Sequence, residues 1–553
     1  MERHGGRILA DQLALQGIRR VFSVPGESFL AALDGLYDVG IPNITCRHEG
    51  GAAMMAEAYG KMTGQPGVLF VTRGPGATNA ASGLHVARQD STPMVVFVGQ
   101  IARAHRDREA FQELDYRRFF GPLVKWVAEV DQTERLPEYI ARAFHIAVSG
   151  RPGPVVLALP EDMPSARADV PDLPPSARLP PEPGAAQVAA VAEALAQAER
   201  PLVVVGGPHW SAQAAADLAR FAGAFDLPVA VSFRRQGHLD NRHPCYVGDL
   251  GVGMNPRLGA RLATADLVLA LGTRLGDTAT NGYTLLDPIR PGPRIVHVHA
   301  DADELGRVWR PDPGIALPAP AMVAALARLN GQPGPWAAWR AVARAEYEAW
   351  TTPRQTPGAV RMEQVIAWLS AHLPEDAIVT NGAGNYAAFL HRYFAFKAHG
   401  TQLAPTSGSM GYGFPAAISA ALEHPGRAVI CLAGDGCFQM TLNEMSTAIQ
   451  HGAKVVVIVA NNGRYGTIRM HQERRFPGRV SGTDLANPDY PALARAYGDD
   501  GVAVTDQAAF PAAMARALAA TVPFVVELQL DPEALATSQT LSEARAMGEA
   551  GAG

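Results

Sequence analysis

The sequence is poor in cysteine and lysine, and it contains no long apolar run. No Cys-x-x-Cys pair occurs, which argues against a zinc ribbon or a redox dithiol and predicts buried or half-buried free thiols in a reducing compartment: Cys46, Cys245, Cys431 and Cys437. Lys61, one of four lysines, lacks the upstream glycine of a phosphate-binding loop, and this disfavours a Walker-type nucleotidase. So few lysines also disfavour Schiff-base chemistry. Without a run of 18 apolar residues or a signal-peptide pattern, we expect a cytoplasmic protein with no membrane partner.

An excess of positive charge is missing too. The net charge of −5 at pH 7 argues against a nucleic-acid partner. With 48% hydrophobic and 18% charged residues, the chain has the composition of a globular protein rather than a disordered one. Its 553 residues suffice for three or four domains of about 150 residues each.

Apolar strand-like runs alternate with helix-like runs along three stretches of the chain. The proline-rich segment 164–184 separates the first stretch from the second, and a stretch broken by Pro and Gly, which also contains a helix, separates the second from the third. Such alternation predicts parallel sheets covered by helices on both faces. We therefore expect an α/β fold of three doubly wound parallel-sheet domains, at 1–165, 185–335 and 355–537, and a frayed polar tail from about residue 538.

The third stretch carries the sharpest chemical signal. One apolar run ends in Gly434-Asp435-Gly436 and the next ends in Asn461-Asn462-Gly463, so that Asp435 and Asn462 lie 27 residues apart. Because the carboxyl ends of parallel neighbours meet at one edge of a sheet, we expect the two side chains to lie together. A carboxylate and an amide oxygen suit Mg²⁺ or Ca²⁺ and leave positions for phosphate oxygens. Each motif alone is also typical of an ordinary turn after a strand.

Gly-Asp-Gly followed by Asn-Asn resembles the cofactor motif of the thiamine diphosphate enzymes, and the resemblance extends along nearly the whole chain. It is closest to the acetohydroxyacid synthase (acetolactate synthase) group. The resemblance implies a pyrimidine-binding, a central and a diphosphate-binding domain, in that order. It also implies that Asp435, Asn462 and the backbone carbonyl of Arg464 hold Mg²⁺ against the diphosphate of the cofactor.

Further residues of the third stretch are implied as cofactor contacts. Met410, which by itself is typical of a core, would prop the cofactor in its bent shape, and the Gly408 carbonyl would accept a hydrogen bond from the 4′-amino group. Other implied positions lie beside the diphosphate or the substrate adduct: Gly384, Asn385, Tyr386, Gly436, Cys437, Tyr465 and Gly466. The Gly-Asn-Tyr segment matches by position only, because relatives carry Gly-Gln-His there.

The first stretch offers a candidate catalytic carboxylate. Glu49 stands between a strand-like and a helix-like run, where a carboxylate is by itself typical of a stabilised helix N-terminus. The resemblance implies that Glu49 instead bonds N1′ of the aminopyrimidine and drives the imino tautomer that deprotonates C2 of the thiazolium.

Three more residues of this stretch are implied in the site. Asn79, in the segment Thr72–Asn79 that resembles Ser-Gly-Pro-Gly-Ala-Thr-Asn, would line the cofactor pocket. Gln112, in Phe-Gln-Glu, would contact the substrate adduct, and the alternative is that it is an ordinary loop residue. Gly26 would occupy the turn that faces the thiazolium, where some relatives place a histidine and this chain does not.

Several residues specific to the synthases are replaced. Pro-Lys-Asp reads Pro-Glu-Asp with Glu161 in place of the lysine, the last arginine of Arg-Phe-Asp-Asp-Arg is Thr278, and the tryptophan of Gln-Trp-Gln is His471. An arginine fork suits a carboxylate and threonine does not replace it. We therefore predict thiamine chemistry with a different donor or acceptor.

The changes at 274–278 also fall where the synthases hold a non-redox FAD. The sequence leaves open whether FAD, an ADP-type nucleotide or nothing occupies the central domain. No Gly-x-Gly-x-x-Gly follows a strand-like run there, so NAD is not predicted.

These observations lead to one main hypothesis. The chain is expected to be a thiamine diphosphate- and Mg²⁺-dependent carboligase or lyase that acts on a 2-oxoacid or 2-hydroxycarbonyl substrate through a C2 carbanion-enamine. The alternatives are a 2-oxoacid decarboxylase, a 2-hydroxyacyl lyase, and a non-catalytic cofactor-binding paralogue. Because the family builds its site from two subunits, the resemblance also implies a homodimer or homotetramer.

Overall fold

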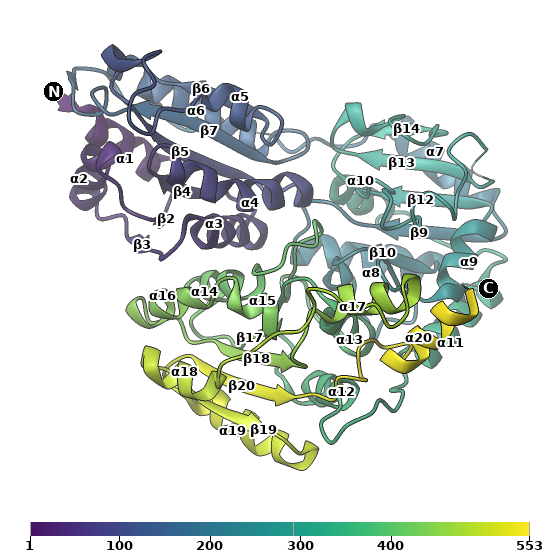
Figure 1. Ribbon diagram of the computed structural model, residues 1–553. Coiled ribbons are helices and arrows are strands. Elements are labelled where there is room, and N and C mark those ends of the chain that lie inside the picture. The colour runs from purple at the N-terminus through teal and green to yellow at the C-terminus, as the bar shows by residue number, and fades with distance from the viewer. Residues whose placement is uncertain (1, 178, 291, 552–553) are drawn as a thin grey trace.

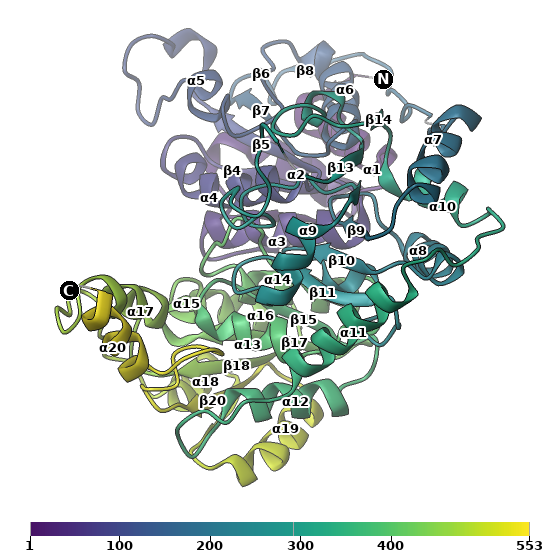
Figure 2. The same ribbon diagram turned by 90° about the vertical axis from the view of Figure 1, so that its right-hand side faces the viewer.

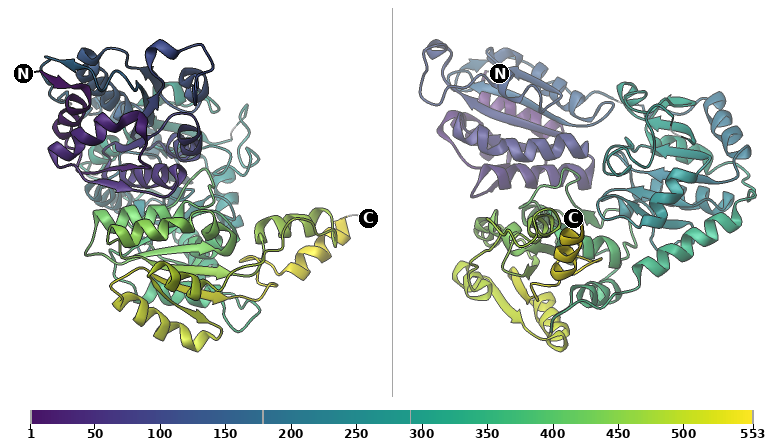
Figure 3. Two further views of the ribbon diagram at one scale, coloured as in Figure 1. Left: turned by 60° about the vertical axis from the view of Figure 1, so that its left-hand side comes forward. Right: turned by 45° about the vertical axis from the view of Figure 1, so that its right-hand side comes forward.

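The protein consists of three sheet-and-helix units, which a computed structural model describes for residues 2–177, 179–290 and 292–551. Each unit holds a six-stranded sheet, and the three units meet at a common junction (Figures 1 and 3). All strand pairs within these three sheets are parallel, as alternating strands and helices predict. The predicted fold class is therefore confirmed.

The first sheet has the strand order β3-β2-β4-β5-β7-β6. Its strands are β2 (Val21–Ser23), β3 (Asn43–Thr45), β4 (Gly67–Val71), β5 (Met94–Gln100), β6 (Trp126–Glu129) and β7 (Pro154–Pro160). Its helices are α1 (Gly5–Leu15), α2 (Leu30–Val39), α3 (Glu49–Thr63), α4 (Pro75–Asp90), α5 (Tyr116–Phe120) and α6 (Leu136–Val148). The central strands β4, β5 and β7 are buried along their whole length, which explains their continuous apolar runs. A short antiparallel pair, β1 (Arg3–His4) with β8 (Arg167–Ala168), ties the two ends of this unit together.

The central sheet has the order β11-β10-β9-β12-β13-β14. Its strands are β9 (Pro201–Val205), β10 (Val229–Ser232), β11 (Tyr246–Leu250), β12 (Leu267–Leu271), β13 (Arg294–His299) and β14 (Gly314–Ala316). Its helices are α7 (Ala185–Ala196), α8 (Ala212–Phe225), α9 (Pro256–Thr264) and α10 (Ala319–Leu326), and α11 (Ala337–Thr351) leads to the third unit. The order reverses between β9 and β12, which makes this the switch point of a doubly wound sheet.

The third sheet has the order β16-β15-β17-β18-β20-β19. Its strands are β15 (Ile378–Asn381), β16 (Gln402–Leu403), β17 (Val429–Gly434), β18 (Val456–Asn461), β19 (Asp500–Val504) and β20 (Phe524–Gln529). Its helices are α12 (Met362–His372), α13 (Asn385–Tyr393), α14 (Gly413–Glu423), α15 (Asp435–Gln439), α16 (Met445–Gln450), α17 (Gly466–Arg475), α18 (Tyr490–Tyr497), α19 (Phe510–Ala519) and α20 (Leu541–Gly551).

The first and third units pack against each other through α3 and α14, which lie side by side in Figures 1 and 2. The Glu444 carboxylate accepts hydrogen bonds from the backbone amides of Arg47 and His48, immediately before α3 begins. Glu444 is fully buried, and these charge-assisted bonds fix the entry into α3.

The prediction of a frayed tail was wrong. Helix α20 packs on α17, and the Arg545 guanidinium pairs with the Glu473 carboxylate at 2.8 Å. Leu541 and Ala544 of α20 form a small apolar cluster with Met470 of α17 and Leu535. A second ion pair joins Glu543 of α20 to Arg354, so a polar sequence can be ordered by a few buried contacts and two ion pairs. No helix among the described residues is long and apolar enough to cross a membrane.

Candidate functional site

Asp435 lies at the carboxyl end of β17, where the sequence places it, and is the first residue of α15. Its Oδ1 accepts a hydrogen bond from the Gly436 amide at 2.9 Å, and its Oδ2 accepts one from the Gly463 amide at 2.9 Å. The Asn487 amide nitrogen donates to the same Oδ2 at 2.8 Å. Burial raises the pKa of Asp435, and these donors oppose the rise. The carboxylate is thus fixed in place with its acceptor atoms turned to one edge of the sheet.

Asn462 follows the neighbouring strand β18 and lies at the same edge. A cavity of about 50 Å³ is lined by Asp435, Asn462, Arg464 and Gly466 together with Tyr386. Asp435 and Asn462 therefore lie close together, as expected. Among the described residues, no group of three or more His, Cys, Asp or Glu side chains could hold a metal ion. A cation at this edge would instead use one carboxylate with amide and carbonyl oxygens, a donor set that suits Mg²⁺.

The Gly384-Asn385-Tyr386 segment lies beside this edge at the start of α13. The Tyr386 hydroxyl donates to the Cys437 sulfur at 3.1 Å, and the Gly411 amide donates to the same sulfur at 3.1 Å. Asn385 accepts a hydrogen bond from the Thr467 hydroxyl at 2.9 Å. Cys437 thereby joins α13, α15 and the loop that carries Met410, a contact that the sequence did not reveal.

Gly408 and Met410 lie in that loop, between β16 and α14. Gly408 has a φ of 69°, a conformation that favours glycine, and its backbone is exposed. Met410 is half-buried, and the Gly411 carbonyl that follows it accepts a bond from the Thr441 hydroxyl at 2.8 Å. A half-buried methionine on an anchored loop differs from the ordinary core methionine that was the alternative.

Gly466 begins α17, and Tyr465 immediately precedes the helix. A Cβ atom at Gly436 would stand 2.5 Å from the Tyr465 ring, so this ring packs directly on the Gly436 backbone. Glycine at this position is therefore required by a close approach rather than by a turn.

Glu49 is the first residue of α3 and is 8% exposed. The Asn79 amide nitrogen donates to Glu49 Oε2 at 3.0 Å. A Cβ atom at Gly76 would stand 3.1 Å from Glu49 Oε1, so the N-terminus of α4 closes over the carboxylate. The structure thus brings together Glu49 and Asn79, a contact that neither motif predicted.

Gly26 and Gln112 lie at the same edge of the first sheet. A Cβ atom at Gly26 would clash with Thr72, at 2.5 Å from its Cβ. Gln112 has a φ of 66° and packs on Gly74, where an added Cβ would stand 2.9 Å from the Gln112 Cβ. Gln112 is half-buried, and its left-handed backbone is held by this packing.

A charged cluster at this edge was not predicted from the sequence. Arg73, after β4, pairs with Glu27 at 2.7 Å and with Glu161 at 2.9 Å. Glu161 is the residue that stands where the synthases have lysine, and Arg73 neutralises it. Arg73 and Glu161 each replace a residue of the expected motif, the first with a positive and the second with a negative charge. These two opposite charges were the signal that could have revealed the cluster.

Two of the replaced synthase positions lie near the surface. Thr278 is half-buried in the loop after β12, and His471 on α17 is exposed. Arg274 in the same loop donates to the Gln89 carbonyl at 3.4 Å, so it contacts the first unit.

The Glu49 group and the Asp435 group form two separate half-sites. Among the described residues, no hydrogen bond or ion pair joins Glu49, Asn79 or Gln112 to the residues around Asp435. Each half-site is nevertheless organised on its own.

Comparisons with known proteins agree with this division. The family described as thiamine pyrophosphate enzyme matches in three parts: the N-terminal TPP binding domain at residues 3–119, the central domain at 188–326 and the C-terminal TPP binding domain at 382–528. The chain is 33% identical over 545 residues to an acetolactate synthase large subunit from Parasynechococcus marenigrum, with 95% of this chain and 87% of the relative covered. It is 31% identical over 531 residues to the acetolactate synthase isozyme 2 large subunit of Escherichia coli, with 96% of each covered.

Proposed function

The chain belongs to the thiamine pyrophosphate enzymes of the acetolactate synthase type, and from that premise we propose that it is a Mg²⁺-dependent carboligase or lyase for a 2-oxoacid or 2-hydroxycarbonyl substrate. The observation that carries the proposal is that both half-sites are built while the residues specific to the synthases are changed. Glu49 is held by Asn79, and Asp435 is held beside Asn462.

The residues around Asp435 fit a metal-bound diphosphate. Asp435, Asn462 and the Arg464 carbonyl would hold Mg²⁺, because they offer three hard oxygen atoms at one sheet edge. The Gly436 backbone would approach the diphosphate, with Cys437, Tyr386, Asn385 and Gly384 beside it. Tyr465 and Gly466 would close the other side. Met410 and the Gly408 carbonyl would support the ring system of the cofactor.

Thiamine diphosphate, when bound, supplies an acidic carbon and an electron sink for carbanion chemistry. Glu49 would hold the proton at N1′ of the aminopyrimidine, and Asn79 would keep the Glu49 carboxylate in place through its hydrogen bond to Oε2. Gly26 and Gln112 would line the substrate side. The close cover of Gly76 over Glu49 would exclude water from the carboxylate.

The residues at the positions that recognise substrate in the synthases support a donor substrate or an acceptor substrate different from theirs. Thr278 provides no fork for a carboxylate, and Arg73 is already paired with Glu27 and Glu161. A decarboxylase or 2-hydroxyacyl lyase that uses a single carbonyl substrate is the second candidate, because it needs no second carboxylate-binding arginine.

We also propose that two chains complete the site. The separated half-sites support this, as do large apolar side chains left exposed around them: Phe111 is 75%, Ile468 54% and Met440 51% exposed. A homodimer or homotetramer would bury them and bring Glu49 of one chain to Asp435 of the other. Four buried free thiols support a reducing, cytoplasmic location. FAD in the central domain stays a prediction.

The variant Glu49→Gln tests the function. With saturating thiamine diphosphate and Mg²⁺, we expect turnover of a panel of 2-oxoacids and aldehydes to fall at least about 100-fold, since general acid-base groups contribute about 10²–10⁴ in rate. Calorimetric affinity for thiamine diphosphate should stay within a few-fold of that of the wild type. The products formed from the panel separate carboligation, decarboxylation and lyase activity.

Two outcomes would contradict the proposal. If the wild type binds no thiamine diphosphate, the cofactor assignment of this chain fails. If it binds the cofactor and turns over no member of the panel, the chain is the non-catalytic paralogue.

A further inference from the structure

Residues 404–412 connect β16 to α14 and carry Gly408 and Met410, which the proposed function places against the ring system of the cofactor. Among the described residues, the middle of this 404–412 loop forms hydrogen bonds only with the loop itself. The Gly408 amide donates to the Pro405 carbonyl at 3.0 Å, and the Ser409 hydroxyl donates to the Met410 carbonyl at 3.2 Å. The positions of Gly408 and Met410 are therefore set by the residues that hold the two ends of the loop.

The far end of the loop is held by α3 and by the third unit. The Tyr412 hydroxyl donates to Glu57 Oε2 at 2.6 Å, and the Thr441 hydroxyl donates to the Gly411 carbonyl at 2.8 Å. Glu57 lies on α3 and is fully buried. These contacts fix the point at which the loop enters α14.

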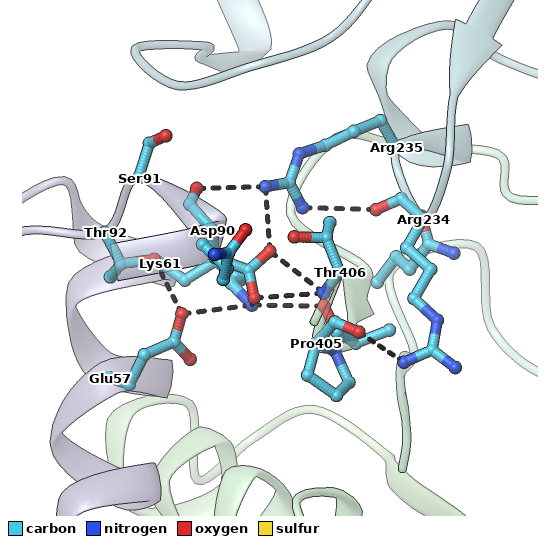
Figure 4. Close-up of polar contacts among 12 residues, drawn as sticks. Glu57, Lys61, Asp90, Ser91, Thr92, Arg234, Arg235, Pro405 and Thr406 are labelled. Atoms are coloured by element: carbon cyan, nitrogen blue, oxygen red, sulfur yellow. Dashed lines mark hydrogen bonds and ion pairs between the residues drawn. The ribbon is translucent and has the colours of Figure 1, made fainter. Parts of the chain in front are cut away.

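The near end of the loop is held by Asp90, the last residue of α4, whose side chain is fully buried. The Thr406 amide donates to the Asp90 carboxylate, at 3.1 Å from Oδ2 and 3.2 Å from Oδ1. The same carboxylate pairs with Lys61 at 3.2 Å and with Arg235 at 3.0 Å. Figure 4 shows Asp90 between these three partners, which belong to the third, first and central units. Asp90 thus joins all three units at one point of the loop.

Two charged side chains bind the loop backbone next to this point. Lys61 Nζ donates to the Ala404 carbonyl at 3.1 Å, and Arg234 Nη1 donates to the Pro405 carbonyl at 2.5 Å (Figure 4). Three consecutive residues of the loop therefore each give one backbone group to a charged side chain of another unit.

The charges in this network are balanced, because Lys61 also pairs with Glu57 at 3.1 Å and two carboxylates thus face two cations. Burial raises the pKa of Asp90, but Lys61 and Arg235 outweigh that effect and hold its pKa below the ordinary value of 3.8. Replacing a buried ion network by apolar side chains is often neutral or stabilising, so fold stability alone does not explain this one. Its charge-assisted bonds instead hold a stretch of loop backbone in a single arrangement.

We propose that Asp90 is a positioning residue of the thiamine site: by binding the Thr406 amide it fixes the Gly408 carbonyl and Met410 against the bound cofactor. Within the described part of the chain Asp90 forms no hydrogen bond with residues 407–410, so it acts through the loop. This role rests on the proposed function and adds to it a residue outside the cofactor motifs.

The variant Asp90→Asn, in the full-length protein, tests this role. Its new NH2 group would face the cation of either Lys61 or Arg235, so that the hold on Thr406 is lost. With saturating Mg²⁺, we expect the calorimetric affinity for thiamine diphosphate to fall about tenfold, the loss typical of a charge-assisted hydrogen bond. At saturating cofactor, the near-ultraviolet circular dichroism of the bound aminopyrimidine should also change, because the Gly408 carbonyl is displaced from the 4′-amino group.

Thr92→Val is the matched control. It removes a buried hydroxyl that donates to Glu57 Oε1 at 2.6 Å in the same network, and Thr92 forms no hydrogen bond with the loop, all of which the structure describes. We expect its melting temperature to fall as that of Asp90→Asn falls, while its cofactor affinity and dichroism stay like those of the wild type. A merely structural role of Asp90 would give both variants the same losses.

A second pair of variants covers the case in which Asp90→Asn does not fold. Arg235→Met removes one cation from Asp90 and leaves the Thr406 contact, so we expect a smaller loss of affinity, about threefold, which Arg235→Lys restores. The proposal is overturned if Asp90→Asn matches the wild type in affinity and dichroism, if Thr92→Val loses as much affinity, or if Arg235→Met binds like the wild type. If the wild type itself binds no thiamine diphosphate, the proposed function fails as well, so the wild-type titration distinguishes the two failures.

Discussion

The first and third sheets share one topology and carry different chemistry. In both, the strands follow the spatial order second, first, third, fourth, sixth, fifth along the chain, whereas the central sheet follows third, second, first, fourth, fifth, sixth. Both outer sheets place a carboxylate at the carboxyl end of a strand and at the start of a helix: Glu49 after the second strand and Asp435 after the third.

The difference between these carboxylates lies in their hydrogen bonds. Asp435 accepts from two backbone amides and from Asn487, so both of its oxygens have fixed donors. Glu49 accepts a side-chain bond from Asn79 at one oxygen. Fixed donors suit a carboxylate that serves as a permanent acceptor for a cation, while a carboxylate with fewer donors can exchange a proton. Two sheets of the same topology thus give their carboxylates different roles through the hydrogen-bond donors around them.

The largest expected effect comes from Asp435→Asn. The new side chain keeps one acceptor oxygen, so its NH2 group would stand against the amide of either Gly436 or Gly463, and the negative charge would be removed. We expect the affinity for thiamine diphosphate in the presence of Mg²⁺ to fall about 100-fold or more, measured by calorimetry. Glu49→Gln is the matched control with near-normal affinity. If both variants lost affinity equally, Asp435 and Glu49 would not have the different roles assigned to them here.

A smaller effect is expected from the residues that position each carboxylate. Asn487→Leu removes the side-chain donor to Asp435 and should weaken Mg²⁺-dependent cofactor binding about tenfold while leaving kcat at saturation unchanged. Asn79→Leu should do the reverse, with kcat lowered about tenfold and affinity retained. Titrating cofactor against activity measures both quantities. If Asn79→Leu changed only affinity, Asn79 would be a binding residue rather than a positioning one.

The sequence predicted what depends on long apolar runs and on motif residues. The buried strands β4, β5, β17 and β18 carry continuous apolar runs, and Asp435 and Asn462 follow from where two of these runs end. Three other edge or near-edge strands were not predicted, because β6, β16 and β19 are short or half-exposed and carry no such run.

The contacts within the site could not be predicted from the sequence for another reason. Cys437 touches Tyr386 and Gly411, and Arg73 touches Glu161, although each partner is far away in the chain. Such pairs depend on how loops from different strands meet, and no local pattern encodes that. The ordered helix α20 was missed because its apolar contacts are few.

The chain ends of the two outer units are held differently. The first unit is tied by backbone pairing of β1 with β8, whereas α20 is held by side chains: the Arg545–Glu473 and Arg354–Glu543 ion pairs and the small apolar cluster. The hydrogen bond from Arg545 lowers the pKa of Glu473 to about 2, so this contribution to stability is present above the ordinary pKa of 4.5 and is lost as pH falls toward 2. We expect Arg545→Met to speed proteolysis before α20 about threefold at pH 7. Cleavage elsewhere should not change, and unchanged cleavage before α20 would mean that the apolar cluster and the Arg354–Glu543 pair hold the helix.

The smallest expected effect concerns the residue that precedes the fifth strand of each outer sheet. Lys125, before β6, donates to the carbonyls of Ile146 and Ser149, both at 2.6 Å, whereas both carboxylate oxygens of Asp499, before β19, are buried without a partner. Burial raises the pKa of Asp499 to about 7 from its ordinary value of 3.8, so folding is favoured by a bound proton at low pH and this stability is lost as pH rises through 7. Asp499→Asn should therefore raise the melting temperature by about 1–2 °C at pH 8 and by clearly less at pH 5, which lies nearer the ordinary pKa of 3.8. A gain of equal size at both pH values would show that Asp499 is charged throughout, and that the third unit tolerates an unpaired carboxylate where the first unit uses a paired lysine.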